Sequence, residues 1–136
     1  MLLPKKVKHR KWHRLRGSER GVDNRGTEVS FGSFGLKSQE GGHITAQQIE
    51  AGRKAISRYV QKGGRMWIRI FPDRPKTAKP PEVGMGAGKG DLVGYFAMVK
   101  AGRVIFEVDG LSDENAHESL RKAGAKLGLK TKIVKR

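Results

Sequence analysis

Cysteine is absent from the 136-residue sequence, and both long apolar runs and acidic side chains are scarce. The lack of cysteine excludes disulfides, thiolate zinc sites and thiol nucleophiles together. No apolar stretch approaches the roughly 18 residues of a membrane span. The opening stretch MLLPKKVKHRKWHRLR lacks the apolar segment of a secretory signal, and it lacks the serines of a transit peptide. These absences lead us to expect a soluble, intracellular protein.

The scarcity of acidic residues leaves a large positive charge. The chain has 29 Lys and Arg against 13 Asp and Glu, which gives a formal net charge of +16. A small domain needs a net charge of only about 2–8 for solubility. The excess predicts a partner that carries many negative charges, with nucleic acid as the first choice and an anionic membrane surface as the second.

Residues 1–25 are strongly basic, with nine Lys or Arg and two acidic residues. They contain too few apolar side chains to form a core, so we predict an N-terminal arm that is disordered when free and orders against its partner. A tail that only improves solubility is the alternative. Trp12 lies among cations, a pattern that suits base stacking as well as phosphate contact. The candidate RNA-binding residues of the arm are Lys5, Lys6, Lys8, Arg10, Lys11, Trp12, His13, Arg14 and Arg16.

Residues 26–136 have the periodicities of a single α+β domain. We predict a mixed or antiparallel sheet with two helices packed on one face. Thr45 and Gln48 form a capping box for the first helix, which we expect to stop at Gly63-Gly64. The remaining predicted elements are strand 27–36, strand 65–71, strands 92–100 and 103–110 joined in a hairpin at Ala101-Gly102, a helix from Ser112 with the apolar stripe Ala116, Leu120, Ala123 and Leu127, and strand 129–136.

Basic and acidic side chains are predicted to lie on different faces of this domain. On the first helix, Arg53, Lys54, Arg58 and Lys62 lie largely outside the apolar face. An ordinary solvated surface is the alternative reading, but the net charge favours phosphate contact for part of this row. The carboxylates near the second helix are expected to mark the face turned away from RNA. They are Glu107, Asp109, Asp113, Glu114 and Glu118.

Residues 72–91 are predicted to be a loop with four prolines, four glycines and four basic residues. Twenty structureless residues inside a domain indicate a functional loop. A P-loop would need glycine at Val83 and a hydroxyl at Gly90, and the following segment reads as a strand rather than a helix. The NTP-site hypothesis is therefore weak. We expect the glycines to allow close approach to a sugar-phosphate backbone and Arg74, Lys76, Lys79 and Lys89 to supply charge. A loop without a ligand is the alternative.

Other chemistry has little support in the sequence. His9 and His13 have a metal-like spacing, but in so basic a stretch we expect them to contact nucleic acid instead. No serine lies in a recognisable nucleophile motif. We predict no enzyme activity, no metal, no cofactor, no small-molecule substrate and no membrane partner.

Several blocks, in order, resemble the universal large-subunit ribosomal protein family whose bacterial members are numbered sixteen. They include PKKVKHRKWHR, SFGSFGLK, ITAQQIEAGRKAISR, GGRMWIRIFPDRPKTAKP, MGAGKG, GRVIFEVDGL and KTKIVKR, and they cover almost the whole chain. The resemblance implies a structural constituent of the large subunit, in the cytoplasm of a bacterium or in an organelle. Its implied partners are large-subunit ribosomal RNA, transfer RNA and neighbouring ribosomal proteins.

The resemblance also implies that the glycine loop and the arm point towards the A and P transfer RNA sites. The matching loop residues are Gly84, Met85, Gly86, Gly88, Lys89 and Gly90. Many bacterial relatives carry an arginine at the position of Gly84, so no role of that arginine can be transferred. The alternative function is an RNA chaperone or assembly factor that is not stably resident in the ribosome.

Overall fold

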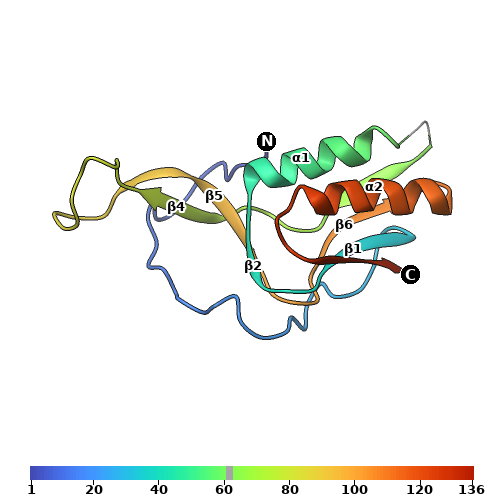
Figure 1. The fold of residues 1–136 in the computed structure, drawn as a ribbon, viewed down its shortest axis with the longest axis horizontal. Helices are drawn as coiled ribbons and strands as arrows, with labels where there is room; N and C mark the ends of the chain where they lie inside the picture. Colours follow the sequence, from blue (N-terminus) through green and yellow to red (C-terminus); the bar gives the residue numbers. More distant parts are fainter. Residues whose placement is uncertain (61–62) are drawn as a thin grey trace.

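The computed structural model describes residues 1–60 and 63–136. Within these residues, seven strands form two antiparallel sheets, and two helices accompany them (Figure 1). The first sheet has the order β3-β6-β1-β7 and the second has the order β2-β5-β4. The α+β class is confirmed, although the strands divide into two sheets where we expected one. The bounds are β1 Phe34–Ser38, β2 Gly42–Thr45, α1 Ala46–Ser57, β3 Arg65–Ile68, β4 Arg74–Ala78, β5 Asp91–Val99, β6 Val104–Asp109, α2 Asp113–Ala125 and β7 Thr131–Lys135.

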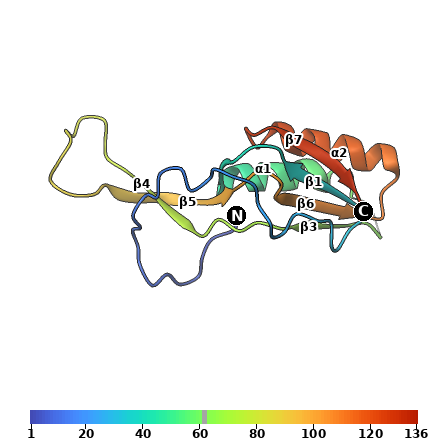
Figure 2. The same ribbon diagram turned by 90° about the horizontal axis from the view of Figure 1, so that it is seen from below.

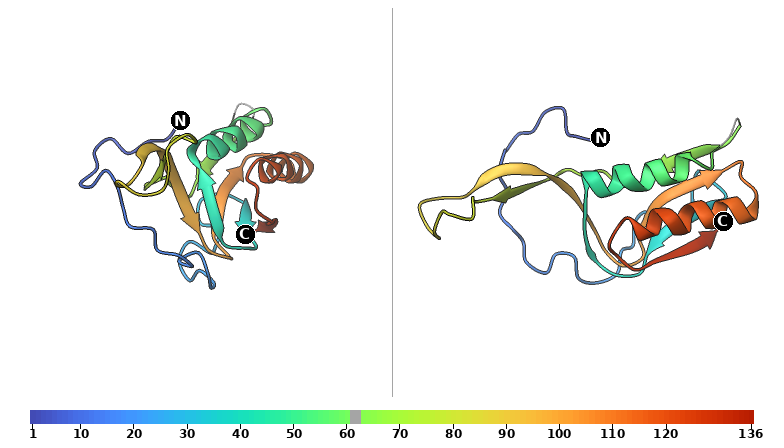
Figure 3. Two further views of the ribbon diagram at one scale, coloured as in Figure 1. Left: turned by 60° about the vertical axis from the view of Figure 1, so that its left-hand side comes forward. Right: turned by 45° about the horizontal axis from the view of Figure 1, so that its top comes forward.

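Both helices cover the same face of the four-stranded sheet, as predicted (Figure 2). Phe106 at the centre of β6 is fully buried, and it lies opposite Leu36 of β1 and Ile68 of β3. The helices lie side by side above these strands (Figure 3). Gly52 of α1 is required for this packing, because an added Cβ would lie 2.9 Å from the Phe106 ring. The predicted apolar stripe of α2 is buried, with Leu120 fully inside the core.

The starts of both helices agree with the prediction and the end of α1 does not. The N–H of Gln48 donates to the Thr45 hydroxyl over 3.2 Å, and the Thr45 N–H donates to the Gln48 side chain over 2.9 Å. Ser112 caps α2. The first helix ends at Ser57, several residues before Gly63, because the Tyr59 N–H donates to the carbonyl three residues back and tightens the last turn. Lys62 lies outside the described residues.

The face of this sheet opposite the helices is covered by the segment before β1. We predicted a strand from residue 27, but the regular strand begins only at Phe34. The N–H groups of Ser30, Phe31 and Gly32 donate to the carboxylate of Glu107, over 2.9, 2.7 and 3.0 Å. Their hydrogen bonds therefore go to a side chain instead of a neighbouring strand, which is why this stretch is not regular.

The prediction that Glu107 belongs to an acidic surface is wrong, because Glu107 is buried. Its side chain is 0% exposed, whereas Asp109, Asp113 and Glu114 lie at the surface. Arg69 Nη1 lies 2.6 Å from Glu107 Oε1. Burial raises the pKa of Glu107, but the three backbone donors and Arg69 outweigh it and hold the pKa below its ordinary value. Glu107 is thus a buried structural carboxylate and not part of a surface cluster.

The predicted hairpin between β5 and β6 is wrong, although both strands exist and Ala101-Gly102 does form the turn between them. Strand β5 pairs with β2 and β4, whereas β6 pairs with β1 and β3. The hydrogen bonds near the turn explain the separation: the Gly102 N–H donates to the Ser38 carbonyl and the Ser38 N–H donates to Arg103. Ser38 thus occupies the position that a paired hairpin strand would need.

The predicted structureless stretch 72–91 contains a strand. Residues Arg74–Ala78 form β4, which pairs with β5 from Arg74 opposite Phe96 to Ala78 opposite Asp91. Pro75 is tolerated because β4 is at the edge of its sheet, where one side needs no ladder hydrogen bonds. The loop is therefore shorter, residues 79–90, and the β4–β5 ribbon projects it away from the helices (Figure 1).

Candidate nucleic-acid interface

The N-terminal arm crosses the three-stranded sheet and follows the β4–β5 ribbon (Figure 2). The Ser18 hydroxyl lies 2.9 Å from the sulfur of Met98, and the Asp23 N–H donates to the Ala101 carbonyl over 2.9 Å. At Gly41 an added Cβ would clash with the carbonyl oxygen of Glu19. The arm is therefore docked through its backbone. Its disorder in the free protein, and the division at residues 25 and 26, stay predictions.

The arm residues that we predicted to bind RNA are all exposed. Trp12 is 43% exposed, and none of the cations of this group is buried. On the ribbon, Lys76 is exposed and Arg74 is half-buried, and Lys79 at the start of the loop is also half-buried. None of these side chains is buried, although Lys11 and Lys79 already donate to backbone carbonyls of the loop. The residues are Lys5, Lys6, Lys8, Arg10, Lys11, His13, Arg14 and Arg16 from the arm, Arg74 and Lys76 from the ribbon, and Lys79 from the loop.

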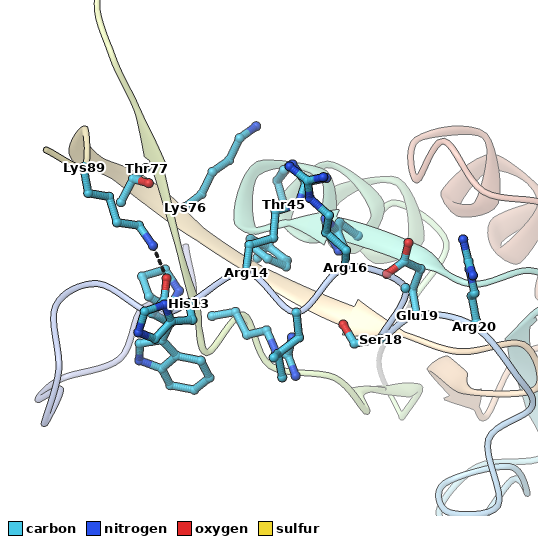
Figure 4. Close-up of a pocket in the computed structure, with 17 residues that line it drawn as sticks. His13, Arg14, Arg16, Ser18, Glu19, Arg20, Thr45, Lys76, Thr77 and Lys89 are labelled. Atoms are coloured by element: carbon cyan, nitrogen blue, oxygen red, sulfur yellow. Dashed lines mark hydrogen bonds between the residues drawn. The ribbon is translucent and has the colours of Figure 1, made fainter. Parts of the chain in front are cut away.

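Arm and sheet enclose a cleft of about 550 Å³ (Figure 4). Its lining comes from the arm, β2, β4, the loop and β5, and it gathers cations from segments far apart in the sequence. Thr45, the N-cap of α1, also lines it, so the positive end of the helix dipole lies beside the same space. Glu19 is the acidic residue of the lining. The cations are Arg14, Arg16 and Arg20 from the arm, Arg74 and Lys76 from β4, and Lys89.

Two stacked rings form part of the cleft wall. The ring centroids of His43 and Phe96 lie 4.3 Å apart with an interplanar angle of 28°. Burial lowers the pKa of His43; Glu19 opposes this shift, and Arg14, Arg74 and Lys76 lower the pKa further. The lowered pKa favours the neutral imidazole, a flat polar ring among cations.

The arm and the loop are fastened to each other by two lysines. Lys89 Nζ donates to the Trp12 carbonyl, and Lys11 Nζ donates to the Lys89 carbonyl over 3.3 Å. The guanidinium of Arg74 lies 6.0 Å from the centre of the Trp12 ring. Lys89 was predicted only as a loop residue near transfer RNA; the structure also makes it a contact between loop and arm.

The tip of the loop makes few contacts with the rest of the described chain. Met85 is fully exposed, and an added Cβ at Gly84, Gly86 or Gly88 would meet nothing within 4 Å. The backbone is left-handed at Gly86, Ala87 and Gly88, with φ of 106°, 59° and 106°. Lys79 Nζ donates to the Gly86 carbonyl and braces this bend. The tip therefore presents bare backbone to solvent.

The cations of α1 are not brought to the cleft. Arg53 pairs with Glu50 on its own helix at 2.5 Å, and among the described residues Arg53, Lys54 and Arg58 are not part of the cleft lining. The sequence reasoning missed His43, Phe96, Thr45 and Thr77. These residues meet only because β2 and β4 flank β5, and neither flanking strand was predicted.

Within residues 1–60 and 63–136 no group of three or more His, Cys, Asp or Glu side chains could hold a metal ion. Over the same residues, no helix is long and apolar enough to cross a membrane.

An α+β core that carries an exposed basic arm and a basic ribbon defines an RNA-binding protein of the ribonucleoprotein class. Over residues 4–134 the chain matches the family described as Ribosomal protein L16p/L10e, and it belongs to that family. The resemblance expected from the sequence is confirmed. The chain is thus a ribosomal protein of the large subunit, with a place in translation.

Proposed function

We infer that the protein binds large-subunit ribosomal RNA through its arm and ribbon and approaches transfer RNA near the A and P sites through loop 79–90. The observation that carries this inference is the cleft between arm and ribbon, where cations from segments far apart in the sequence converge. We expect a structural role, without catalysis, cofactor or small-molecule substrate. Family membership places it in a ribosome of the cytoplasm or of an organelle.

The distribution of charge supports the ribosomal RNA contact. Exposed Lys and Arg side chains recur along the arm, and Lys76 of β4 adds an exposed cation on the ribbon beside them. Phosphate contacts of this kind release counterions, so affinity falls steeply with salt. If about eight phosphates are neutralised, the slope of log K against log salt should be roughly −6 to −7.

The shape of the loop supports the transfer RNA contact. The ribbon projects the loop beyond the folded core, its tip offers backbone groups, and Lys89 adds a positive charge at the base of the tip, where its ammonium contacts the Trp12 carbonyl. Glycine at such positions lets a sugar-phosphate backbone approach closely. The loop is followed by strand β5, so no helix N-terminus faces it as in a P-loop, and nucleotide hydrolysis lacks support.

Sedimentation of a native lysate in moderate salt tests the proposal. We expect stoichiometric protein in large subunits and whole ribosomes, and it should survive washes that strip loosely bound cationic proteins. Presence only on immature particles, or at the top of the gradient, would instead favour an RNA chaperone or assembly factor.

A further inference from the structure

We propose that the cleft between arm and ribbon receives one unpaired nucleotide extruded from an RNA strand, with its phosphate among the cleft cations and its base stacked on His43. This inference rests on the proposed RNA-binding function and names the feature of RNA that the cleft selects. A continuous duplex backbone needs only a charged surface, whereas an extruded nucleotide needs a hollow with a flat wall.

The size of the cleft fits a single nucleotide. Its volume of about 550 Å³ lies within the range of about 300–1,000 Å³ of pockets that bind small organic molecules. A groove that follows phosphates alone requires charge but no such volume. The depth therefore accommodates a base in addition to its phosphate.

The stacked rings supply the flat wall. His43 stacks on Phe96, is exposed and lines the cleft, so its ring is the aromatic surface on which a base in the cleft would stack. The lowered pKa of His43 favours the neutral ring, which adds a stacking surface without adding a charge to a site rich in cations. Bases stack on aromatic side chains whatever their identity, because every base has a π-face.

The cations lie around this wall on two sides. Arg14 and Arg16 come from the arm and Lys76 comes from β4 (Figure 4). The hydroxyl of Thr77 lines the same space and can donate to a phosphate or a 2′-hydroxyl. A phosphate between arm and ribbon would relieve the repulsion between cations that the fold brings together.

The site depends on the docking of the arm. Gly41 contacts the Glu19 backbone so closely that a side chain would displace the arm from β2. Substitution of Gly41 by alanine therefore opens the cleft without removing a charge or an aromatic ring. Gly94 is a matched control on β5, because an added Cβ there meets nothing within 4 Å.

The probe is an RNA hairpin with one bulged 2-aminopurine, compared with the fully paired hairpin of the same stem. We expect the full-length protein to bind the bulged hairpin about tenfold more tightly, with a change of 2-aminopurine fluorescence on binding. His43→Ala and Gly41→Ala should abolish this preference, His43→Phe should retain it, and Gly94→Ala should match the parent protein. Lys76→Ala should weaken binding to both hairpins and reduce the preference without abolishing it, because the stacking surface of His43 remains.

Each alternative outcome has a distinct meaning. Equal affinity for the two hairpins, or a preference that survives His43→Ala, would overturn the nucleotide site and leave the RNA-binding function standing. Failure to bind either hairpin would overturn both. Displacement of the bulged hairpin by free adenosine monophosphate at concentrations near the hairpin Kd would overturn the assignment to an RNA strand and indicate a free-nucleotide site.

Discussion

Strands β5 and β6 follow one another through a tight turn, yet they belong to regions of opposite character. In β6 every residue from Val104 to Val108 is buried, whereas β5 is mostly exposed or half-buried and becomes buried only near its end, at Ala97 and Val99. The helix-covered sheet therefore resembles the interior of a globular domain. The ribbon resembles a surface on both sides. A single segment, residues 91–109, thus connects the buried core to the exposed surface that we propose to bind RNA.

The comparison indicates that stability and binding are assigned to separate parts of the chain. Burial of apolar side chains between the helices α1 and α2 and the four-stranded sheet stabilises this part of the molecule. The ribbon buries little, so its form depends on strand pairing, on the docked arm and on continuity with the core. Substitutions in one region should therefore leave the property of the other nearly unchanged.

The largest effect is expected at Glu107. Glu107→Ala leaves Arg69 and three backbone N–H groups without their partner, so we expect a loss of about 3–5 kcal/mol in the free energy of unfolding. Urea unfolding measures this loss. Glu114→Ala, an exposed acid in the first turn of α2, is the control and should lose at most about 1 kcal/mol. A strong loss of RNA affinity in the folded fraction of Glu107→Ala would contradict the separation of stability from RNA binding.

The pKa of Glu107 predicts how this stability depends on pH. Because the pKa is lowered in the folded state, the stabilisation is fully present above the ordinary glutamate pKa and is lost as the pH falls through the lowered folded value. In Glu107→Gln this part of the acid-induced loss should be missing. Unfolding free energies measured from neutral to acidic pH compare the two proteins. Identical pH profiles would contradict the assigned role of the carboxylate.

A smaller loss of stability is expected at Gly52. Gly52→Ala places a methyl group against the Phe106 ring, and overpacking of this kind destabilises by about 1–3 kcal/mol. Gly94→Ala on β5 should change thermal unfolding much less, since its Cβ would meet nothing. Equal losses from the two substitutions would show that the ribbon is packed as tightly as the core.

Substitution of cleft cations is expected to change RNA affinity and to leave stability unchanged. The double substitution Arg14→Ala and Lys76→Ala removes two exposed charges and no core contact, so the slope of log K for RNA against log salt should become shallower by about 1.5–2. The thermal midpoint should stay unchanged. An unchanged slope would mean that these side chains do not reach phosphates.

The smallest effect is expected at the tip of the loop. Lys89→Ala should weaken contact with transfer RNA several-fold and leave incorporation into the large subunit nearly intact, because Lys11 still donates to the backbone carbonyl at position 89 and keeps the arm on the loop. Transfer RNA binding to purified ribosomes and the subunit content of the protein are the two measurements. Lys11→Ala, which removes the reverse contact between arm and loop, is the control. Equal loss of transfer RNA binding and of incorporation would contradict the proposal that the loop contacts transfer RNA while the rest of the protein holds it in the subunit.

Local sequence signals predicted the helices well because their causes are local. The capping box at Thr45 and the stripe of α2 depend on neighbours within a few residues. Strand partners depend on residues far away, so β5 and β6 read as a hairpin although Ser38 separates them. Strand β4 was missed because Pro75 and its glycine-rich neighbourhood are typical of a loop. Only the edge position of the strand makes that proline compatible with a sheet.

Most cations of the cleft were among the residues predicted to bind RNA, but Arg20 was not, and the shape of the cleft was not predicted. That these cations bind RNA stays a prediction. Glu107 could not be recognised as buried, because its three backbone partners lie some 75 residues earlier in the chain. The His43–Phe96 pair depends on the register of β2 against β5, for which the sequence offers no local signal.

The contacts of the arm also have a consequence for the order of events during synthesis. Ser18 contacts Met98 and Ser30 contacts Glu107, so the arm and the segment before β1 are translated well before the residues that they contact. At about 5–20 residues per second, the delay is about 4–15 s. During that interval the arm has no folded sheet on which to dock. A nascent chain therefore presents the segment that we propose to bind RNA before the strands that hold this segment in place have been made.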